Sequence, residues 1–284
     1  MSIVLQICVF LMMTAVGIGL TPLDFRRLGE KPRLMVIATV GQWLLLPMVA
    51  WAVAWALPLP PYLVAGMALL AACPAGAVSN YYSYLARADV ALSVSLTAIS
   101  LVASIITLPI IVTIGFRMLL AEEFRADVPI TAIASQLLLA VLLPVVLGMV
   151  VRHRWPAMVI RHEGRVRRAS EIVLVLTVVV LIISLRGTLL DHLGVTVLAA
   201  AVFIVVAAGV GLAIGKLLGA EDRQQRALML EFACRNTALT ILIGMTALGR
   251  PEFAVFGLVV FLTQMPLVLG GITLARRNHH PTAL

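Results

Sequence analysis

The chain has 284 residues, of which 62% are hydrophobic and only 12% charged, and its mean hydropathy is +1.10. A water-soluble fold of this length cannot bury so many apolar side chains, so the composition excludes a soluble globular protein and indicates a polytopic membrane protein. The net charge of +8 follows from an uneven placement of basic residues across the membrane, and a nucleic-acid partner is not needed to explain it.

Long apolar runs recur along the chain at about the 20 residues that a helix needs to cross a bilayer. They lack the alternation of a membrane β-strand, so we expect an all-α bundle rather than a barrel. Three cysteines (Cys8, Cys73 and Cys234) lie inside these runs, and we expect no disulfide. We expect about nine spans, at roughly residues 2–21, 34–56, 61–86, 89–115, 129–151, 169–186, 193–218, 224–249 and 251–275.

The ends of these spans predict an orientation. Sixteen Lys and Arg residues fall on one side of the expected membrane and four on the other, while Arg235 lies within a span. Because positive charge is retained on the cytoplasmic side, we expect the N-terminus outside and the C-terminus inside, in a cell (plasma or inner) membrane. The basic segment 152–168 is interpreted as a cytoplasmic connector, with an interfacial lipid-binding patch as the alternative.

Two segments in opposite halves of the chain place polar residues within their spans, and the first also contains helix-breaking residues. The first reads CPAGAVSN (73–80), where Pro74 and Gly76 predict a broken helix, and the second reads EFACRNTALT (231–240). They lie five spans apart and therefore run in opposite directions, which is the arrangement of an inverted repeat. Broken helices expose carbonyl oxygens at mid-membrane, and with the carboxylate of Glu231 they suit a cation such as Na⁺. A transporter is the leading interpretation.

At these segments the chain resembles the bile acid:sodium symporter family. The resemblance covers GIGLTPLDF (17–25), ATVGQWLLLP (38–47), CPAGAVSNYYSYLARADVALSVSLTAIS (73–100) and EFACRNTALT (231–240), and corresponds to a nine-helix form. It implies a panel of helices beside a core domain with two crossing discontinuous helices, and a crevice between them for an organic anion. We assign 1–58 and 129–186 to the panel, 59–128 and 187–277 to the core with breaks near 73–80 and 231–236, and 278–284 to a cytoplasmic tail.

The resemblance also implies two sodium sites. The first matches the family at every position and is formed by Ser79, Asn80, Ser93, Thr97 and Glu231. Ser93 and Thr97 share one helix face, which fits ligation and also fits ordinary packing between helices. The second site, in which Arg235 stands where the family usually has Gln, would use Gln42, Glu231, Phe232, Cys234 and Arg235.

Arg235 has three interpretations. A guanidinium has no acceptor atom and stays charged, so Arg235 cannot ligate sodium and is expected to replace the second ion permanently. It could instead form a buried structural pair with Glu231, four residues away, or bind a substrate carboxylate or sulfate. Residues that are candidates for the substrate crevice, or alternatively for helix packing, are Thr14, Asn236, Thr263, Gln264 and Arg235.

The expected function is sodium-coupled symport of an organic anion, bile-acid-like or a small carboxylate, with Na⁺ as the coupled ion. The alternatives are a sodium-independent or proton-coupled anion carrier, an arsenite or auxin-type carrier, and a non-transporting anion sensor. Catalytic motifs such as HExxH or a phosphate-binding loop are missing from the sequence, so we do not expect an enzyme. The expected partners are the substrate anion and the lipid bilayer, and the sequence is compatible with a monomer.

Overall fold

The structure is a computed structural model that describes residues 2–21, 31–120 and 129–277; the expected tail, 278–284, lies outside the described residues. In this part of the chain the fold is helical, with one isolated antiparallel bridge between Ala75 and Arg235. In chain order the helices are α1 (Ser2–Gly19), α3 (Pro32–Ala56), α4 (Pro61–Ala72), α5 (Val78–Leu85), α6 (Val90–Leu119), α7 (Ile130–Leu137), η3 (Leu138–Leu142), α8 (Leu143–Arg154), α9 (Pro156–Ser184), α10 (Arg186–Asp191), α11 (Leu193–Leu217), α12 (Asp222–Ala233), α13 (Thr237–Thr246), η4 (Pro251–Phe253) and α14 (Ala254–Arg277).

Five helical stretches among the described residues are long and apolar enough to cross a bilayer. Three shorter apolar helices accompany them, at Leu5–Gly19, Pro61–Ala72 and Thr237–Thr246. These features support the expected all-helical, multi-pass membrane protein, while the number of nine spans stays a prediction. The five longer stretches are Pro32–Ala56, Val90–Leu119, Ile130–Arg154, Leu193–Leu217 and Pro251–Leu274.

Most of the basic segment, from Pro156 onward, is part of a long helix, whereas Arg152–Arg154 end α8. α9 begins at Pro156, well before the start near residue 169 that the apolar run indicates. Proline fits the first turn of a helix, where its missing N–H would have no partner, and the chain from 157 to 184 contains no further proline. The helix therefore passes through the basic residues before it reaches the apolar run.

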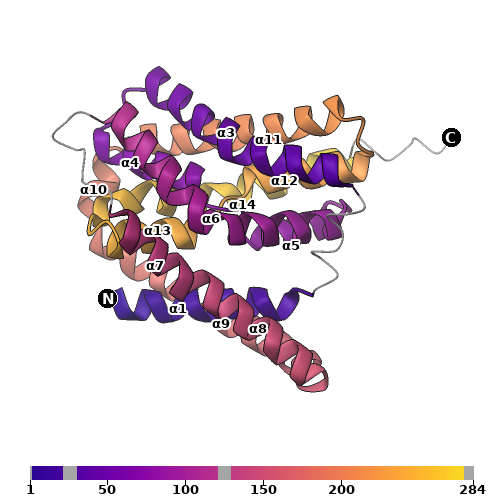
Figure 1. Cartoon of the computed structure of the whole chain (residues 1–284). Coiled ribbons are helices and arrows are strands. Elements are labelled where there is room, and N and C mark those ends of the chain that lie inside the picture. Colours follow the sequence, from indigo (N-terminus) through magenta and orange to yellow (C-terminus); the bar gives the residue numbers. More distant parts are fainter. Residues whose placement is uncertain (1, 22–30, 121–128, 278–284) are drawn as a thin grey trace.

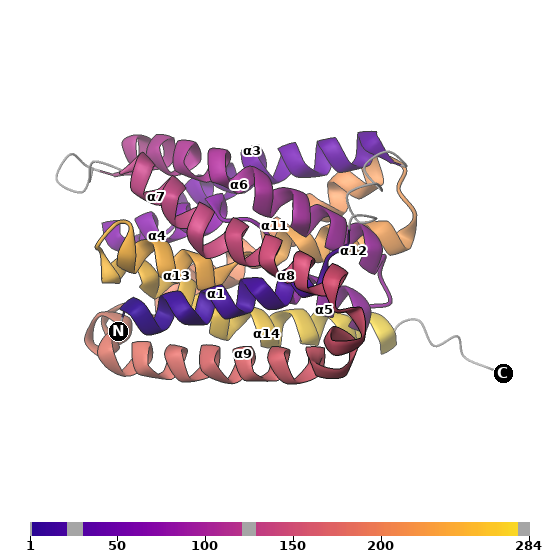
Figure 2. The ribbon, with the colours of Figure 1, turned by 60° about the horizontal axis from the view of Figure 1, so that its bottom comes forward.

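One group of helices consists of α1, α8 and α9. α1 packs against both of the others, and Figure 2 shows it running between them. The approach of α1 to α8 is close because Gly148 has no side chain: a Cβ there would lie 2.3 Å from the carbonyl oxygen of Thr14. Small residues of this kind let membrane helices pack backbone to backbone.

The second group is built around α3, α4, α6, α11, α12 and α14. α3 packs against α4, α6 and α11; the division of the chain into panel and core stays a prediction. The physical reason for this packing is a buried stripe at helical spacing, because Ala38, Gln42, Leu46 and Ala50 all face the interior. In Figure 1, α3 and α11 lie on the opposite side of the molecule from α1, α8 and α9.

Candidate functional site

Two interrupted helices meet inside the second group. α4 ends at Ala72 and α5 resumes at Val78, while α12 ends at Ala233 and α13 resumes at Thr237. The two interruptions pair as a short antiparallel bridge, in which the N–H of Gly76 donates to the carbonyl of Cys234 and the N–H of Asn236 donates to the carbonyl of Pro74, both at 3.0 Å. These backbone groups therefore find partners without a continuous helix.

Local sequence explains why the chain breaks at these points. Pro74 has no N–H to continue α4, and at Gly76 a Cβ would lie 3.2 Å from the carbonyl oxygen of Arg235, so a side chain would crowd the crossing. On the other strand of the bridge, the side-chain oxygen of Asn236 accepts from the N–H of Leu239 at 3.0 Å and starts α13 as an N-cap.

The carboxylate of Glu231 lies beside this crossing and is fully buried. Ser79 Oγ donates to Oε2 at 2.6 Å, Ser93 Oγ lies 2.9 Å from the same oxygen, and Thr97 Oγ1 lies 2.7 Å from Oε1. These hydroxyls come from α5 and α6, whereas Glu231 comes from α12. The structure therefore brings three separate helices to one carboxylate.

Asn80 completes the cluster. Its Oδ1 lies 2.8 Å from Ser93 Oγ and 3.3 Å from Thr97 Oγ1, and Ser79 Oγ lies 2.8 Å from the carbonyl of Gly76. The three hydroxyls thus make six contacts with acceptor oxygens but carry only three protons. At most three of the six contacts can therefore be two-centre hydrogen bonds, so the cluster has more acceptors than donors.

An excess of acceptor oxygens is the chemistry of a site for a hard cation. Such ions take carboxylate, carbonyl, amide and hydroxyl oxygens as ligands, and the cluster offers each of these types. Within the described residues, Glu231 has no ion pair, and no group of three His, Cys, Asp or Glu side chains is placed to hold a metal. The residues present therefore fit an alkali cation bound by oxygen and not a transition-metal centre.

Arg235 lies on the other side of the crossing and is 3% exposed. One Nη donates to Gln42 Oε1 at 2.8 Å, the other donates to the carbonyl of Cys73, and Nε is buried with no partner among the described residues. The guanidinium thus joins α3 to the end of α4. The oxygens of Gln42 and Cys73 thus already accept from the guanidinium.

The alternative of a Glu231–Arg235 structural pair is not what the structure shows. The two side chains make no ion pair, and each is hydrogen-bonded to a different set of residues. The reason is the end of α12 at Ala233, since the i, i+4 neighbourhood of two side chains exists only while the helix continues. Their separation leaves the Glu231 carboxylate open to another cation.

The remaining residues of the expected second site are partly assembled. Gln42 and Arg235 are in contact, the carbonyl of Cys234 accepts from Gly76, and the ring of Phe232 is buried toward α3 and α11. Glu231 directs its oxygens to the first set of residues instead. All three cysteines are described, and none of them forms a disulfide.

The crevice candidates differ from one another. The hydroxyl of Thr14 donates to the carbonyl of Phe10 at 2.8 Å, and the hydroxyl of Thr263 donates to the carbonyl of Val259 at 2.9 Å. Both acceptors lie one turn earlier on the same helix, as is usual for a threonine in a helix. Asn236 caps α13, as described above. Gln264 on α14 is buried, and its Oε1 has no hydrogen-bond partner among the described residues.

Sequence reasoning missed one participant, the carbonyl of Cys73 that accepts from Arg235. The available signal was Pro74, because a helix that ends at a proline leaves its last carbonyls without intrahelical donors. The donor to this carbonyl, Arg235, comes from a segment 162 positions away that crosses the first break. No local sequence pattern therefore predicts the contact.

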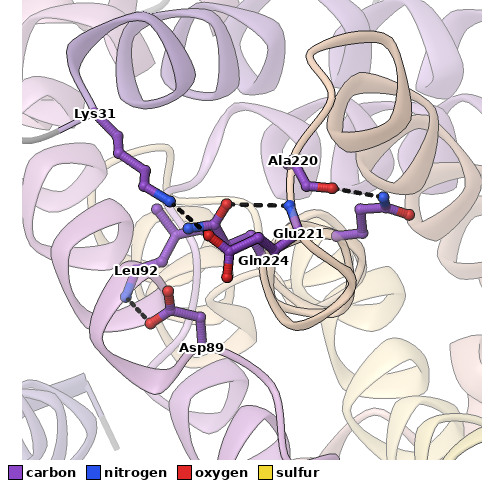
Figure 3. A network of polar contacts seen from close by, with 7 residues as sticks. Lys31, Asp89, Leu92, Ala220, Glu221 and Gln224 are labelled. Carbon is purple, nitrogen blue, oxygen red and sulfur yellow. Dashed lines mark hydrogen bonds and ion pairs between the residues drawn. The ribbon is translucent and has the colours of Figure 1, made fainter.

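A polar network at one end of the bundle holds the site's helices in register (Figure 3). Lys31 Nζ pairs with Glu221 Oε1 at 3.1 Å, and the side chain of Asp89 caps α6 by accepting from the N–H of Leu92 at 3.0 Å. The N–H of Asp89 also donates to the carbonyl of Arg223 at 2.9 Å. The first turns of α6 and α12 are thereby fastened together, which sets Ser93 and Thr97 opposite Glu231.

Comparison with known proteins shows which chains this one is similar to. The chain is 30% identical over 239 residues to the protein named uncharacterized sodium-dependent transporter YocS of Bacillus subtilis (strain 168), covering 82% of this chain and 71% of that protein. It is 28% identical over 268 residues to the probable sodium/metabolite cotransporter BASS2, chloroplastic, of Oryza sativa subsp. japonica, covering 93% and 61%. It is 26% identical over 241 residues to the ileal sodium/bile acid cotransporter of Cricetulus griseus, covering 84% and 68%.

These names describe transporters rather than enzymes, and they name sodium. Residues 6–193 match the sequence profile described as the Sodium Bile acid symporter family, a stretch that contains the four site residues from Ser79 to Thr97. Glu231 and Arg235 lie beyond the matched residues, so their roles rest on the geometry of the crossing. With most of its length matched, the chain belongs to the sodium bile acid symporter family.

Proposed function

We propose that the chain is a secondary active transporter that couples the movement of sodium to that of an organic anion by alternating access. The observation that carries the proposal is the buried cluster around Glu231, where three hydroxyl protons serve six contacts between oxygens. A sodium ion among these oxygens would relieve the unfavourable contacts and neutralise a carboxylate that is costly to bury alone. Ser79, Asn80, Ser93, Thr97 and Glu231 would bind it.

We further propose that one sodium ion is coupled, because Arg235 takes the place of a second. Gln42 Oε1 and the Cys73 carbonyl already accept from its guanidinium, which cannot leave with the substrate. With one sodium ion bound, the crossing holds one carboxylate and two positive charges. A second sodium ion would add an uncompensated charge in a poorly solvated place, at a cost of several kcal/mol.

The proposed substrate is an organic anion, either bile-acid-like or a small carboxylate. The names of the relatives motivate this class, since one is a sodium/bile acid cotransporter and another a sodium/metabolite cotransporter. We place the substrate between the α1, α8 and α9 group and the rest of the bundle. Of the candidates, Gln264 is favoured as a polar anchor because its buried Oε1 lacks a partner among the described residues; Thr14, Thr263, Asn236 and Arg235 are secondary.

In this proposal the panel comprises α1 and α7 to α9, and the core comprises the remaining helices, including α3. Movement of one group against the other would expose the site alternately to each side of the membrane. The orientation remains the one given by the basic residues, with the N-terminus outside and the C-terminus cytoplasmic in a cell membrane.

The proposal is tested in proteoliposomes with radiolabelled cholate and a panel of small carboxylates such as lactate. We expect an inward sodium gradient to drive accumulation of at least one of these anions, and an equal potassium gradient to give none. Accumulation driven by a pH gradient without sodium would favour the proton-coupled alternative. Saturable binding without counterflow would instead identify a non-transporting sensor.

A further inference from the structure

A groove of about 730 Å³ lies away from the Glu231 cluster, between α11, α12, α14 and the turn that joins α5 to α6. Its lining is apolar over most of its length, with Ile204 and Val205 on α11 and Leu267 and Ile272 on α14. Val205 is 60% exposed, so the groove opens toward the outside of the bundle. An apolar groove open on the side of a membrane protein is accessible to lipid hydrocarbon.

The charged residues among those that line the groove are two arginines, Arg87 and Arg226. Arg226 Nη2 makes a long contact of 3.4 Å with the carbonyl of Arg87, and its Nε is buried with no partner in the described part of the chain. Neither arginine forms an ion pair with a described carboxylate. Two unneutralised guanidinium groups at the end of an apolar groove form a site for an anionic head group.

The backbone conformation of Arg87 also supports a binding role for this residue. Its φ is 52°, in the left-handed region that glycine or asparagine usually occupies at the end of a helix. An arginine is less favourable there than glycine, because its Cβ crowds the backbone. Its presence in the lining beside Arg226 is accounted for if the side chain is used in binding.

The groove and the Glu231 cluster use different faces of α12. Arg226, Met229, Leu230 and Ala233 line the groove at the spacing of one helix face, whereas Glu231 turns toward α5 and α6. None of the residues around the Glu231 carboxylate lines the groove. A ligand in the groove can therefore bind without entering the sodium site.

We propose that this groove binds an anionic phospholipid of the cytoplasmic leaflet, with its phosphate at Arg87 and Arg226 and an acyl chain between α11 and α14. The arginines lie at the end of the bundle that the basic residues predict to be cytoplasmic, where anionic lipids attract basic pockets between transmembrane helices. The long apolar lining matches an acyl chain. Two positive charges at one end of the groove suit a negatively charged phosphate better than a neutral head group.

The test measures thermal unfolding of the purified full chain in detergent against increasing phosphatidylglycerol. We expect saturable stabilisation that does not require sodium. The double variant Arg87→Gln/Arg226→Gln should need a concentration about 25-fold higher, because each basic group near an anionic lipid contributes roughly a factor of five. Arg223→Gln, an exposed arginine on the same helix but outside the groove, should leave the midpoint concentration unchanged.

A second pair of variants, one test and one control, probes the apolar half of the groove. A Cβ at Gly270 or at Gly271 would meet no atom within 4 Å, so both accept a larger residue, but only Gly271 lines the groove. Gly271→Phe should weaken phosphatidylglycerol binding at least tenfold, and Gly270→Phe should not. This pair leaves both arginines intact and does not depend on the folding of the charge variant.

Four results would overturn the proposal. They are equal stabilisation by phosphatidylcholine, equal stabilisation by inorganic phosphate alone, an unchanged midpoint in the double arginine variant, and equal effects of Gly270→Phe and Gly271→Phe. Sodium-dependent cholate binding that Gly271→Phe abolishes would also contradict it, by placing the transported anion in the groove. Failure of sodium-driven transport leaves the lipid site standing, because no residue of the Glu231 cluster takes part in it.

Discussion

Ser79 Oγ lies 2.6 Å from Oε2 of Glu231, although 152 positions separate the two residues in the chain. The contact is possible because the break after α4 and the break after α12 cross and pair through their backbones. Ser79 lies on α5, just after the first break, and Glu231 lies on α12, just before the second break. A change at either break therefore alters the oxygen cluster as well as the local fold.

Ser93 is predicted to contribute to sodium binding in a way that Ser95, two residues away, does not. Ser93 Oγ contacts Glu231 and Asn80, whereas Ser95 Oγ donates to the carbonyl of Ala91 on its own helix at 2.9 Å. Both serines are buried. Sodium at 100 times its Kd should stabilise the wild type and Ser95→Ala by about 2.7 kcal/mol, and Ser93→Ala by much less, as measured by thermal unfolding.

Potassium and choline at the same concentration serve as the controls for that comparison. Asn80→Ala should behave as Ser93→Ala does, because the Asn80 amide oxygen contacts two of the three hydroxyls. Equal shifts with sodium, potassium and choline would mean that these residues are packing groups.

Arg235→Gln is predicted to raise the Hill coefficient for sodium from about one toward two. Gln restores an oxygen donor and removes the fixed positive charge beside Gln42, so a second ion can enter if the sites are coupled. Arg235→Lys keeps the charge and should keep the coefficient near one. Sodium dependence of anion uptake in proteoliposomes measures both variants.

Two outcomes would contradict this account of Arg235. A wild-type Hill coefficient near two would show that the second site is functional despite the guanidinium. Loss of anion binding in Arg235→Gln with sodium binding unchanged would identify Arg235 as a substrate anchor instead.

Part of the site could be predicted from the sequence because its residues belong to short motifs. The resemblance of these motifs to the family implied the set, and the structure brings Ser79, Ser93 and Thr97 to Glu231 and Asn80 to Ser93. The partners of Arg235 were harder to predict. They depend on where α12 ends, and a difference of one turn would have left Arg235 beside Glu231.

For the helices, too, the sequence predicts what a local run of residues determines and not what contacts between distant segments determine. Apolar runs located the long helices, because about 20 residues are needed to cross the bilayer. They did not locate the start of α9 at Pro156, because a basic stretch can continue a helix outside the membrane. Nor do they give the packing of α3 against α4, α6 and α11, which is a tertiary property.

Gly148 is predicted to be necessary for the packing of α1 on α8. A Cβ there would lie 2.3 Å from the backbone oxygen of Thr14, so Gly148→Ala must push the two helices apart, at a cost of about 1–3 kcal/mol. Gly209→Ala in α11 is the matched control, since its Cβ would meet no atom within 4 Å. Thermal unfolding in detergent should show a lower Tm for Gly148→Ala alone; equal values for both would contradict the close contact.

The orientation predicts which side of the membrane each loop faces. A cysteine at Arg165 on α9 should react with an impermeant maleimide only from the cytoplasmic side, and one at Gly187 on α10 only from the outside. Both positions are exposed, and the three native cysteines are buried. The reverse pattern in intact cells would mean that the chain is inserted the other way round.

The central claim is that the Glu231 cluster binds one sodium ion, and equilibrium binding of radioactive sodium to the purified protein tests it most directly. The account predicts saturable binding of about one ion per chain, displaced by unlabelled sodium but not by potassium, and lost in Glu231→Gln. Glu221→Gln, whose carboxylate is exposed and paired with Lys31, should bind as the wild type does. Unchanged sodium binding in Glu231→Gln, or no saturable binding in the wild type, would contradict the account.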